Sequence, residues 1–279
     1  MSIRIIARSI WSNPGNRGQR ILRTFNAIKW QFRKRCVGQP MALTLNNGRK
    51  FVAHPDCVVS SALIYSAIPE YHEIRFIRRR LDRDDVVVDV GANVGHVGLL
   101  LSDAVDPKNI FAFEPTKITF NRLKENWKLN NFPLDGLVEA AVGDQVGVVS
   151  FPDSADPNTM NSISAAQTAS KTREIKIVTL DSCRTMWQSR KVGFLKIDVE
   201  GHEPAVFAGA KEMLRGDRPK LIMFESLDGK VESSIRRILD DANYTIFQLN
   251  SNGEPDLGRT DAQNLFAAPF EILTEITNI

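Results

Sequence analysis

The chain has 279 residues, of which 43% are hydrophobic and 25% are charged, values typical of a globular protein. No apolar run reaches the roughly 18 to 20 residues of a transmembrane helix, and the three cysteines have no paired spacing. The composition therefore excludes a membrane-spanning protein, a disulfide scaffold and a zinc knuckle, and it predicts a soluble, cytoplasmic protein. Residues 1–50 contain eleven Lys or Arg and no acid, which leaves 25 basic and 33 acidic residues, a net charge of −8, elsewhere.

Residues 1–55 are predicted to form a basic N-terminal extension. Within it, QRILRTFNAIKWQFRKR at 19–35 predicts an amphipathic helix. Its apolar positions share one face: Ile21, Phe25, Ile28 and Phe32. This stripe either packs on the rest of the protein or on a second copy in a homo-oligomer, or lies on an anionic membrane as a peripheral contact. MALTLNNGRKFVAH at 41–54 predicts a β-hairpin around an Asn-Asn-Gly turn.

Residues 56–279 are predicted to form the main domain. Helices are expected over 70–85, 117–130, 203–216 and 230–243, and strands over 86–90, 109–114, 136–144, 192–201, 220–226, 244–250 and 263–269. Such alternation is typical of a Rossmann-like, doubly wound α/β sheet that binds ligands at the carboxyl ends of its strands. The sheet is expected to be mostly parallel, with a C-terminal antiparallel hairpin. A β-rich insertion over about 144–187 carries a polar loop, in which Asn161 and Ser162 are candidates for ligand contacts.

The stretch VVVDVGANVGHVG, residues 86–98, predicts a cofactor-binding turn between the first strand and the next helix. Its pattern is Asp89-x-Gly91-x-Asn93-x-Gly95, whereas the dinucleotide fingerprint is G-x-G-x-x-G. An acid at the end of this strand repels a pyrophosphate but suits the cationic end of a ligand that carries an amino acid. The pattern therefore favours S-adenosylmethionine over NAD.

Two further acids lie where an adenosine would be held. Glu114, followed by Pro115, ends the next strand, and its carboxylate can accept hydrogen bonds from both ribose hydroxyls. NAD enzymes also place an acid there, so Glu114 alone does not discriminate between the two cofactors. Asp144 in AAVGD can accept from the adenine amino group, or it can be a simple turn residue.

The combination of these motifs resembles the FkbM family of S-adenosylmethionine-dependent methyltransferases. The resemblance covers roughly residues 60–270 and rests on VVDVGANVGHVGLLLS, IFAFEPTKITFNRLKENWKLNN, AAVGD, VTLDS, LKIDVEGHEPAVFAGAKEMLR and KLIMFES. It implies the class I methyltransferase version of the Rossmann-like fold. It also implies O-methylation of a hydroxyl on a sugar, a glycolipid or a natural product.

The stretch KIDVEGHE, residues 196–203, is the predicted catalytic segment. Asp198, Glu200 and His202 are spaced two residues apart, so in an extended chain their side chains would point the same way. His202 titrates near neutrality and is the predicted general base, with Asp198 or Glu200 orienting it or holding the acceptor. In a second arrangement Asp198, Glu200 and Glu225 bind a divalent cation. Capping of the following helix by Glu200 and Glu203 is the structural alternative.

Three classes of function are consistent with the sequence. A methyltransferase with a small-molecule or glycan hydroxyl acceptor is favoured. A nicotinamide-dependent oxidoreductase is disfavoured by Asn93 and by the lack of a Tyr-x-x-x-Lys pair. A non-catalytic module that binds a membrane or a partner is disfavoured by the intact set of acids. A nucleic-acid partner is not expected, because the basic segment lacks aromatic stacking motifs.

Overall fold

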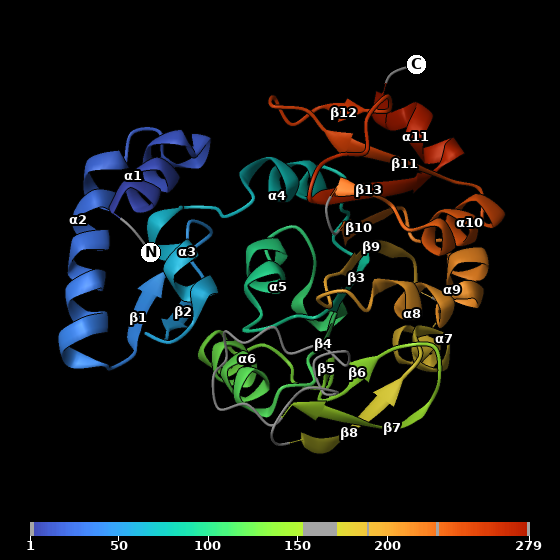
Figure 1. Ribbon diagram of the computed structural model, residues 1–279, viewed down its shortest axis with the longest axis horizontal. Helices are drawn as coiled ribbons and strands as arrows, with labels where there is room; N and C mark the ends of the chain where they lie inside the picture. The colour runs from blue at the N-terminus through green and yellow to red at the C-terminus, as the bar shows by residue number, and fades with distance from the viewer. Residues whose placement is uncertain (1–2, 153–171, 189, 227–228, 278–279) are drawn as a thin grey trace.

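A computed structural model describes residues 3–152, 172–188, 190–226 and 229–277 (Figure 1). Its main sheet contains, in spatial order, β12 (Pro255–Asp256), β11 (Tyr244–Leu249), β13 (Asn264–Pro269), β10 (Leu221–Glu225), β9 (Val192–Ile197), β3 (Val86–Val90), β4 (Ile110–Phe113) and β5 (Leu137–Val138). Within this sheet β5, β4, β3, β9 and β10 run parallel, and β13 is antiparallel to both of its neighbours. The predicted mostly parallel sheet with a C-terminal antiparallel pair is confirmed.

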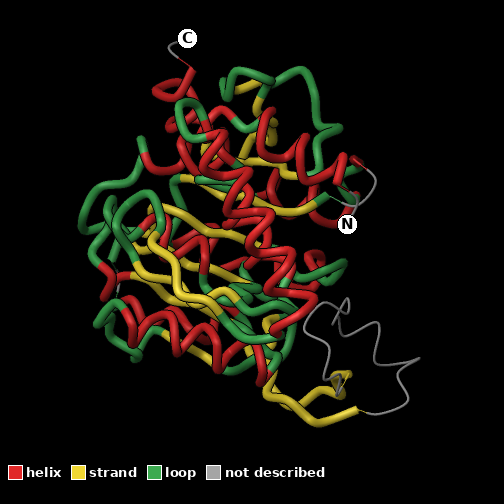
Figure 2. Tube along the Cα trace, turned by 90° about the vertical axis from the view of Figure 1, so that its left-hand side faces the viewer, coloured by secondary structure: helices red, strands yellow, loops and turns green. Residues whose placement is uncertain are grey.

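Helices cover both faces of this sheet, as the tube view shows (Figure 2). They are α4 (Tyr71–Arg78), α5 (His96–Leu101), α6 (Lys117–Leu129), α7 (Leu180–Cys183), α8 (Glu203–Ala208), α9 (Lys211–Gly216), α10 (Ser233–Asp241) and α11 (Phe270–Thr277). Because side chains alternate along a strand, Val86, Val88 and Val90 join one hydrophobic cluster and Val87 joins the other. The central strand β3 is therefore buried on both sides.

Two predicted elements are divided in the structure. The expected strand over 136–144 becomes β5 and β6 (Ala141–Val142), which join different sheets. The expected helix over 203–216 breaks between α8 and α9 at Gly209. A Cβ there would lie 2.0 Å from the carbonyl oxygen of Gly143, so the helix is interrupted where the chain after β6 passes close to it.

The insertion builds a second sheet beside the main one. Strand β6 pairs with β8 (Thr172–Val178), and β8 pairs with β7 (Gly147–Pro152). In Figure 2 the β7–β8 hairpin extends away from the body of the protein. The predicted β-like character of the insertion is confirmed over these strands, whereas Asn161 and Ser162 lie outside the described residues.

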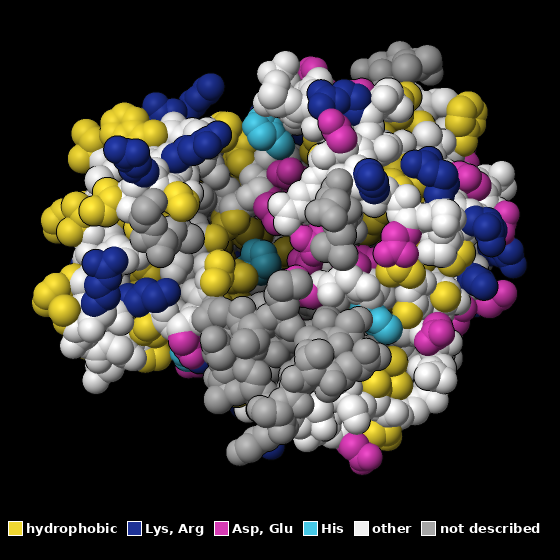
Figure 3. Space-filling view, viewed as in Figure 1, with side chains coloured by type: hydrophobic (Ala, Val, Ile, Leu, Met, Phe, Trp, Pro, Cys, Tyr) yellow, Lys and Arg dark blue, Asp and Glu magenta, His cyan; other side chains and the backbone are white. Residues whose placement is uncertain are grey.

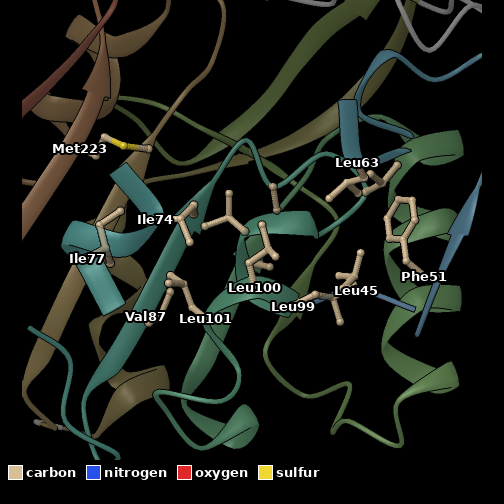
Figure 4. Packing of buried hydrophobic residues seen from close by; sticks show 14 of the residues in the cluster. Leu45, Phe51, Leu63, Ile74, Ile77, Val87, Leu99, Leu100, Leu101 and Met223 are labelled. Atoms are coloured by element: carbon tan, nitrogen blue, oxygen red, sulfur yellow. The ribbon is translucent and has the colours of Figure 1, made fainter. Parts of the chain in front are cut away.

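The N-terminal segment packs as a small lobe against α5 and α6, two of the helices that cover the main sheet. It contains α1 (Ile3–Ser12), short 3-10 and π helices at Pro14–Asn16 and Arg33–Val37, α2 (Arg20–Phe32), the hairpin β1 (Met41–Thr44) and β2 (Lys50–Ala53), and α3 (Val58–Tyr65). The predicted hairpin is confirmed. Leu45, Phe51 and Leu63 of the lobe lie near Leu99 and Leu100 of α5 (Figure 4). Residues on both sides of the predicted boundary at residue 55 thus share one hydrophobic cluster, and the boundary itself stays a prediction.

The apolar stripe of α2 does not pack on the rest of the chain, which corrects that interpretation; packing on a second copy and contact with a membrane stay predictions. The exposed fractions are 82% for Ile21, 65% for Phe25 and Ile28, and 66% for Phe32. The buried side chains of α2 are Ala27 and Trp30, on the opposite face of the helix. Separately, none of the helices in the described part of the chain combines the length and apolar character needed to span a bilayer.

Candidate active site

The site lies where the order of the parallel strands reverses, between β3 and β9, the usual ligand crevice of such sheets. The turn after β3 passes close to its neighbours. Gly91 has φ +78°, and a Cβ there would lie 1.8 Å from the backbone oxygen of Asp198. Gly95 has φ +81°, and a Cβ there would clash with Leu123 and Trp127 of α6. Both glycines are therefore required by the packing of the chain itself.

Glu114, at the end of β4, fixes the conformation of this turn. It is 6% exposed. One carboxylate oxygen accepts from the backbone N–H of Asn93 at 2.9 Å, and the other accepts from the Thr116 N–H and the Thr119 hydroxyl, both at 2.8 Å. Burial raises the pKa of Glu114, although these donors oppose the shift. Pro115 presents its carbonyl oxygen to Arg173 of β8, so the second sheet borders this part of the site.

A buried lysine links the two strands that flank the crevice. The Nζ of Lys196 lies 2.9 Å from Oδ2 of Asp198 and 3.6 Å from Oδ1 of Asp89, and it donates to the Gly91 carbonyl oxygen at 3.4 Å. Burial lowers the pKa of Lys196, but the two carboxylates outweigh it and raise this pKa above its ordinary value. Asp89 is fully buried, whereas the Asp198 side chain is 42% exposed.

Asp198 is thus an accessible carboxylate held in its charged form. Burial raises the pKa of Asp198, but the charge and hydrogen bond of Lys196 lower it by more, so the net shift is downward. The neighbouring His96 has its pKa lowered to about 4 by burial and by Lys196, so its ring is neutral at pH 7. Glu70, before α4, is exposed to solvent, yet the surrounding protein raises its pKa. Asp198 and Glu70 are both accessible to solvent and surrounded by protein, so they lie in the wall of a hollow. Figure 3 shows this hollow between the N-terminal lobe and the main sheet.

The predicted catalytic segment is not extended beyond Ile197, so strand alternation does not place Asp198, Glu200 and His202 on one face. Strand β9 ends at Ile197, and the chain then turns through Glu200 at φ +55° and Gly201 at φ +90°. The Oε1 of Glu203 accepts from the N–H groups of Val199 and Gly201. Glu203 therefore has a structural role, but these bonds hold the turn before α8, and its predicted role as a cap of the helix itself stays a prediction. The turn ends the alternation that an extended strand would impose. It carries His202 away from Asp198, whereas Glu200 stays near enough to Asp198 for that carboxylate to add to the effect of burial in raising the Glu200 pKa.

His202 lies against the loop after β6. A Cβ added to Gly143 would lie 3.2 Å from the Nε2 of His202. Burial lowers the pKa of His202, and Asp144 opposes this shift. His202 and Asp144, predicted for catalysis and for adenine binding, are therefore neighbours. The structure brings together a second group, Asp89, Asp198 and Lys196.

The described residues contain no group of three or more His, Cys, Asp or Glu arranged to hold a metal ion. Glu225 lies near enough to Glu200 to raise its pKa, after the larger effect of burial. Glu225 also accepts from the Gln263 side chain. The ammonium of Lys196 beside Asp198 repels a second cation, so the arrangement does not support the predicted alternative of Asp198, Glu200 and Glu225 as metal ligands.

The site holds most of the buried polar atoms that lack a partner. Among the described residues, eleven buried side-chain N or O atoms have no hydrogen bond. Seven of them belong to residues at the carboxyl ends of β3, β9 and β10: both oxygens of Asp89, and one atom each of Asn93, His96, His202, Glu225 and Ser226. Buried polar groups normally have partners, so these atoms indicate a polar ligand.

Sequence reasoning missed the roles of Lys196, His96 and Glu70 in this hollow. A lysine inside the otherwise apolar strand VGFLKI was the available signal for Lys196, because a buried ammonium needs a carboxylate partner. His96 directly follows the glycine-rich turn, and its place at the start of α5 could have been noted. Nothing in the sequence indicated Glu70, which reaches the site only through the packing of α4.

The sheet order and the turn at its reversal point define a class I methyltransferase fold. The sequence profile of the FkbM methyltransferase domain matches residues 89–246, and the chain belongs to this family of methyltransferases. Hexuronic acid methyltransferase AglP of Haloferax volcanii is 29% identical over 195 residues, which are 68% of this chain and 77% of that protein. This assignment replaces the nicotinamide-dependent and non-catalytic alternatives.

Two solved structures are similar to the chain at low identity. Methyltransferase FkbM from Methylobacillus flagellatus KT is 16% identical with a TM-score of 0.43, and the match covers 76% of this chain and 55% of that one. A SAM-dependent methyltransferase from Agrobacterium tumefaciens is 12% identical with a TM-score of 0.44, and the match covers 84% and 71%. The chain thus spans about half the length of the first of these structures.

Proposed function

We propose that this protein transfers a methyl group from S-adenosylmethionine to a hydroxyl of a sugar, a glycolipid or a related natural product. The observation that carries the proposal is the buried Lys196, which joins Asp89 and Asp198 across the point where the strand order reverses. When bound, the donor supplies a sulfonium methyl group that an oxygen can displace in line. The family membership supports the reaction class, and the name of the Haloferax relative supports a sugar acceptor.

The orphaned polar atoms fit such a donor. Asp89 and Asn93, whose carboxylate and amide oxygens have no hydrogen-bond partner among the described residues, would hold its amino-acid end. Glu114, already fixed by three donors, would accept from one ribose hydroxyl with the lone pair that remains on Oε2. Asp144 and the adjacent His202 would border the adenine. Gly91 and Gly95 allow the turn to pass close to the Asp198 backbone and to α6.

Asp198 is the better placed of the two candidates for the acceptor's proton. Its carboxylate is ionised, partly accessible and held by Lys196, so it can accept a hydrogen bond from a hydroxyl. Its lowered pKa makes it a weak base, and it takes the proton only as the new C–O bond makes that hydroxyl strongly acidic. The predicted base, His202, lies instead against Gly143 beside Asp144. Its catalytic role stays a prediction, which the variants below distinguish from that of Asp198.

The charge of the hollow favours an uncharged acceptor. Among the described residues, Glu70, Asp198, Glu200 and Glu225 place carboxyl groups around it, and the ammonium of Lys196 is already paired. A carboxylate on the acceptor would be repelled, whereas neutral hydroxyls can donate hydrogen bonds to these acids. We therefore expect neutral glycosides to be better acceptors than hexuronic acids.

Calorimetry with S-adenosylmethionine, S-adenosylhomocysteine and NAD in parallel tests the cofactor. We expect both adenosyl ligands to bind. Binding of NAD alone would overturn the proposal. Release of S-adenosylhomocysteine with a panel of neutral glycosides and hexuronic acids then identifies the acceptor class.

The Asp198→Asn and His202→Ala variants locate the base. We expect Asp198→Asn to retain S-adenosylmethionine binding and to lose about 10²- to 10⁴-fold in turnover, the usual contribution of a general base. His202→Ala is expected to lose less turnover. The reverse order would assign the base to His202, as the sequence predicts. Loss of activity on chelation, with recovery on adding Mg²⁺, would contradict both assignments.

A further inference from the structure

Helix α2 has two apolar faces, and only one of them is covered. Trp30 is fully buried, and its indole N–H donates to the Ser61 hydroxyl at 3.1 Å, while Ala27 is 3% exposed. At 100° per residue, Phe25 and Ile28 lie on the opposite side of the helix from Trp30. The fold covers the Trp30 face, and the outer face is left exposed to solvent.

The outer face belongs to a larger apolar surface. Nine of the fifteen exposed large hydrophobic side chains among the described residues lie within residues 3–37. We call the outer face of α2 together with the end of α1 the α1–α2 face. It is defined by Trp11, Ile21, Leu22, Phe25, Ile28 and Phe32, each more than half exposed. Such a concentration of exposed large hydrophobic side chains on one segment points to an interaction site rather than ordinary surface.

Positive charge surrounds this face. Residues 1–50 contain eleven Lys or Arg and no acid. The exposed cations of α1, α2 and their connections are Arg4, Arg8, Arg17, Lys29, Lys34 and Arg35. Arg20 stacks its guanidinium over the exposed Trp11 ring at 5.6 Å. Figure 3 shows basic and hydrophobic side chains side by side over α1 and α2.

This combination selects among the surfaces that could cover the face. A second copy of the chain would bring like charges together, because a two-fold contact places the same basic patch on both sides. A nucleic acid would pair with the arginines but would leave the Ile, Leu and Phe side chains without an apolar partner. An anionic lipid surface satisfies both features, because its headgroups attract the cations and its acyl boundary takes up the apolar side chains.

We propose that the α1–α2 face docks the protein on the surface of an anionic lipid bilayer. In this arrangement α2 lies in the plane of the interface, with Phe25, Ile28 and Phe32 inserted and the flanking cations among the headgroups. The amphipathic sequence of this segment allowed a membrane contact. The tertiary structure adds that Trp30 and Ala27 occupy the inner face. The inference does not depend on which acceptor is methylated.

Co-sedimentation of the full chain with lipid vesicles tests the proposal. We expect binding to vesicles that contain phosphatidylglycerol, weaker binding as the salt concentration rises, and little binding to pure phosphatidylcholine. No binding to the anionic vesicles, or equal binding to both kinds, would overturn it.

Matched variants locate the contact. Phe25 and Phe270 are exposed to nearly the same extent, 65% and 66%, but Phe270 begins α11, far from α2 in Figure 1. We expect Phe25→Asp to weaken partitioning into anionic vesicles by about tenfold or more, and Phe270→Asp to change it less than about twofold. Melting temperatures of both variants verify that they fold. Equal effects of the two would overturn the assignment. So would a wild-type dimer in light scattering that Phe25→Asp dissociates, because the face would then be an interface between copies.

Discussion

Replacing Lys196 by Met is expected to destabilise the fold strongly, although the two side chains have similar volumes. The substitution removes the ammonium that lies 3.6 Å from Asp89 and 2.9 Å from Asp198. Asp89 is fully buried, and its oxygens have no hydrogen-bond partner among the described residues. The variant therefore leaves a buried carboxylate without a counter-charge.

The magnitude follows from the two distances and exposures. At 3.6 Å and an effective dielectric constant of about 20, the Asp89 pair is worth about 5 kcal/mol. The Asp198 side chain is 42% exposed, so solvent screening limits its pair to about 1 kcal/mol. The variant no longer has to bury an ammonium group, and this gain offsets part of the loss of the two ion pairs. We therefore expect the free energy of unfolding to fall by about 3 to 5 kcal/mol at pH 7, the range for breaking a buried ion pair.

The loss should shrink on acidification. Burial already raises the pKa of Asp89, and loss of Lys196 raises it further. A carboxyl group whose pKa is raised in the folded state reduces stability fully at pH values above that pKa. The reduction shrinks as the pH falls from the folded-state pKa towards the lower unfolded-state pKa. The difference in unfolding free energy between wild type and variant is therefore expected to be smaller at pH 5 than at pH 7.

Urea unfolding at both pH values measures these differences. Lys211→Met, at an exposed lysine of α9, is the matched control and should change stability by less than about 0.5 kcal/mol. Adding Asp89→Asn to Lys196→Met should recover part of the loss, because it removes the unpaired charge. A Lys196→Met protein within about 1 kcal/mol of wild type at pH 7, or a deficit that grows at pH 5, would refute this account of the site.

Three further predictions follow from individual contacts. Glu114→Gln should weaken S-adenosylmethionine binding about tenfold or more in calorimetry, since it replaces a charge-assisted acceptor by a neutral amide of the same shape; unchanged affinity would remove Glu114 from the donor site. Gly91→Ala should lower the free energy of unfolding by about 3 kcal/mol or more, because a Cβ would meet the Asp198 backbone. Gly18→Ala is the control, because Gly18 has φ +80° but open space around it, and its free energy of unfolding should fall by only about 1 kcal/mol. Equal losses for the two variants would show that the clash at Gly91 is relieved. In thermal unfolding, Trp30→Ala should lower the free energy of unfolding by about 3 to 5 kcal/mol, and Phe25→Ala should lower it by less than about 0.5 kcal/mol. A larger loss for Phe25→Ala would show that its apolar stripe belongs to the core.

The sequence by itself determined the class of fold and predicted the place of the candidate site. Alternating strand and helix patterns, local in sequence, predicted the parallel sheet and its C-terminal antiparallel pair. The motif from Asp89 to Gly95 and the acid Glu114 identified the first crevice, because each follows directly after a strand. Binary patterning also located the amphipathic α2.

Only the tertiary structure decided how the site is assembled and which face of α2 is covered. The turn at Glu200 separates His202 from Asp198, since its backbone bends where a strand pattern was expected to continue. Lys196 becomes the centre of the site because β3 and β9 are neighbours in the sheet although they lie far apart in the chain. Periodicity shows that a helix has an apolar stripe but does not say what that stripe meets. In α2 the fold buries Trp30 and leaves Phe25 in solvent, because burial depends on which surfaces meet in three dimensions.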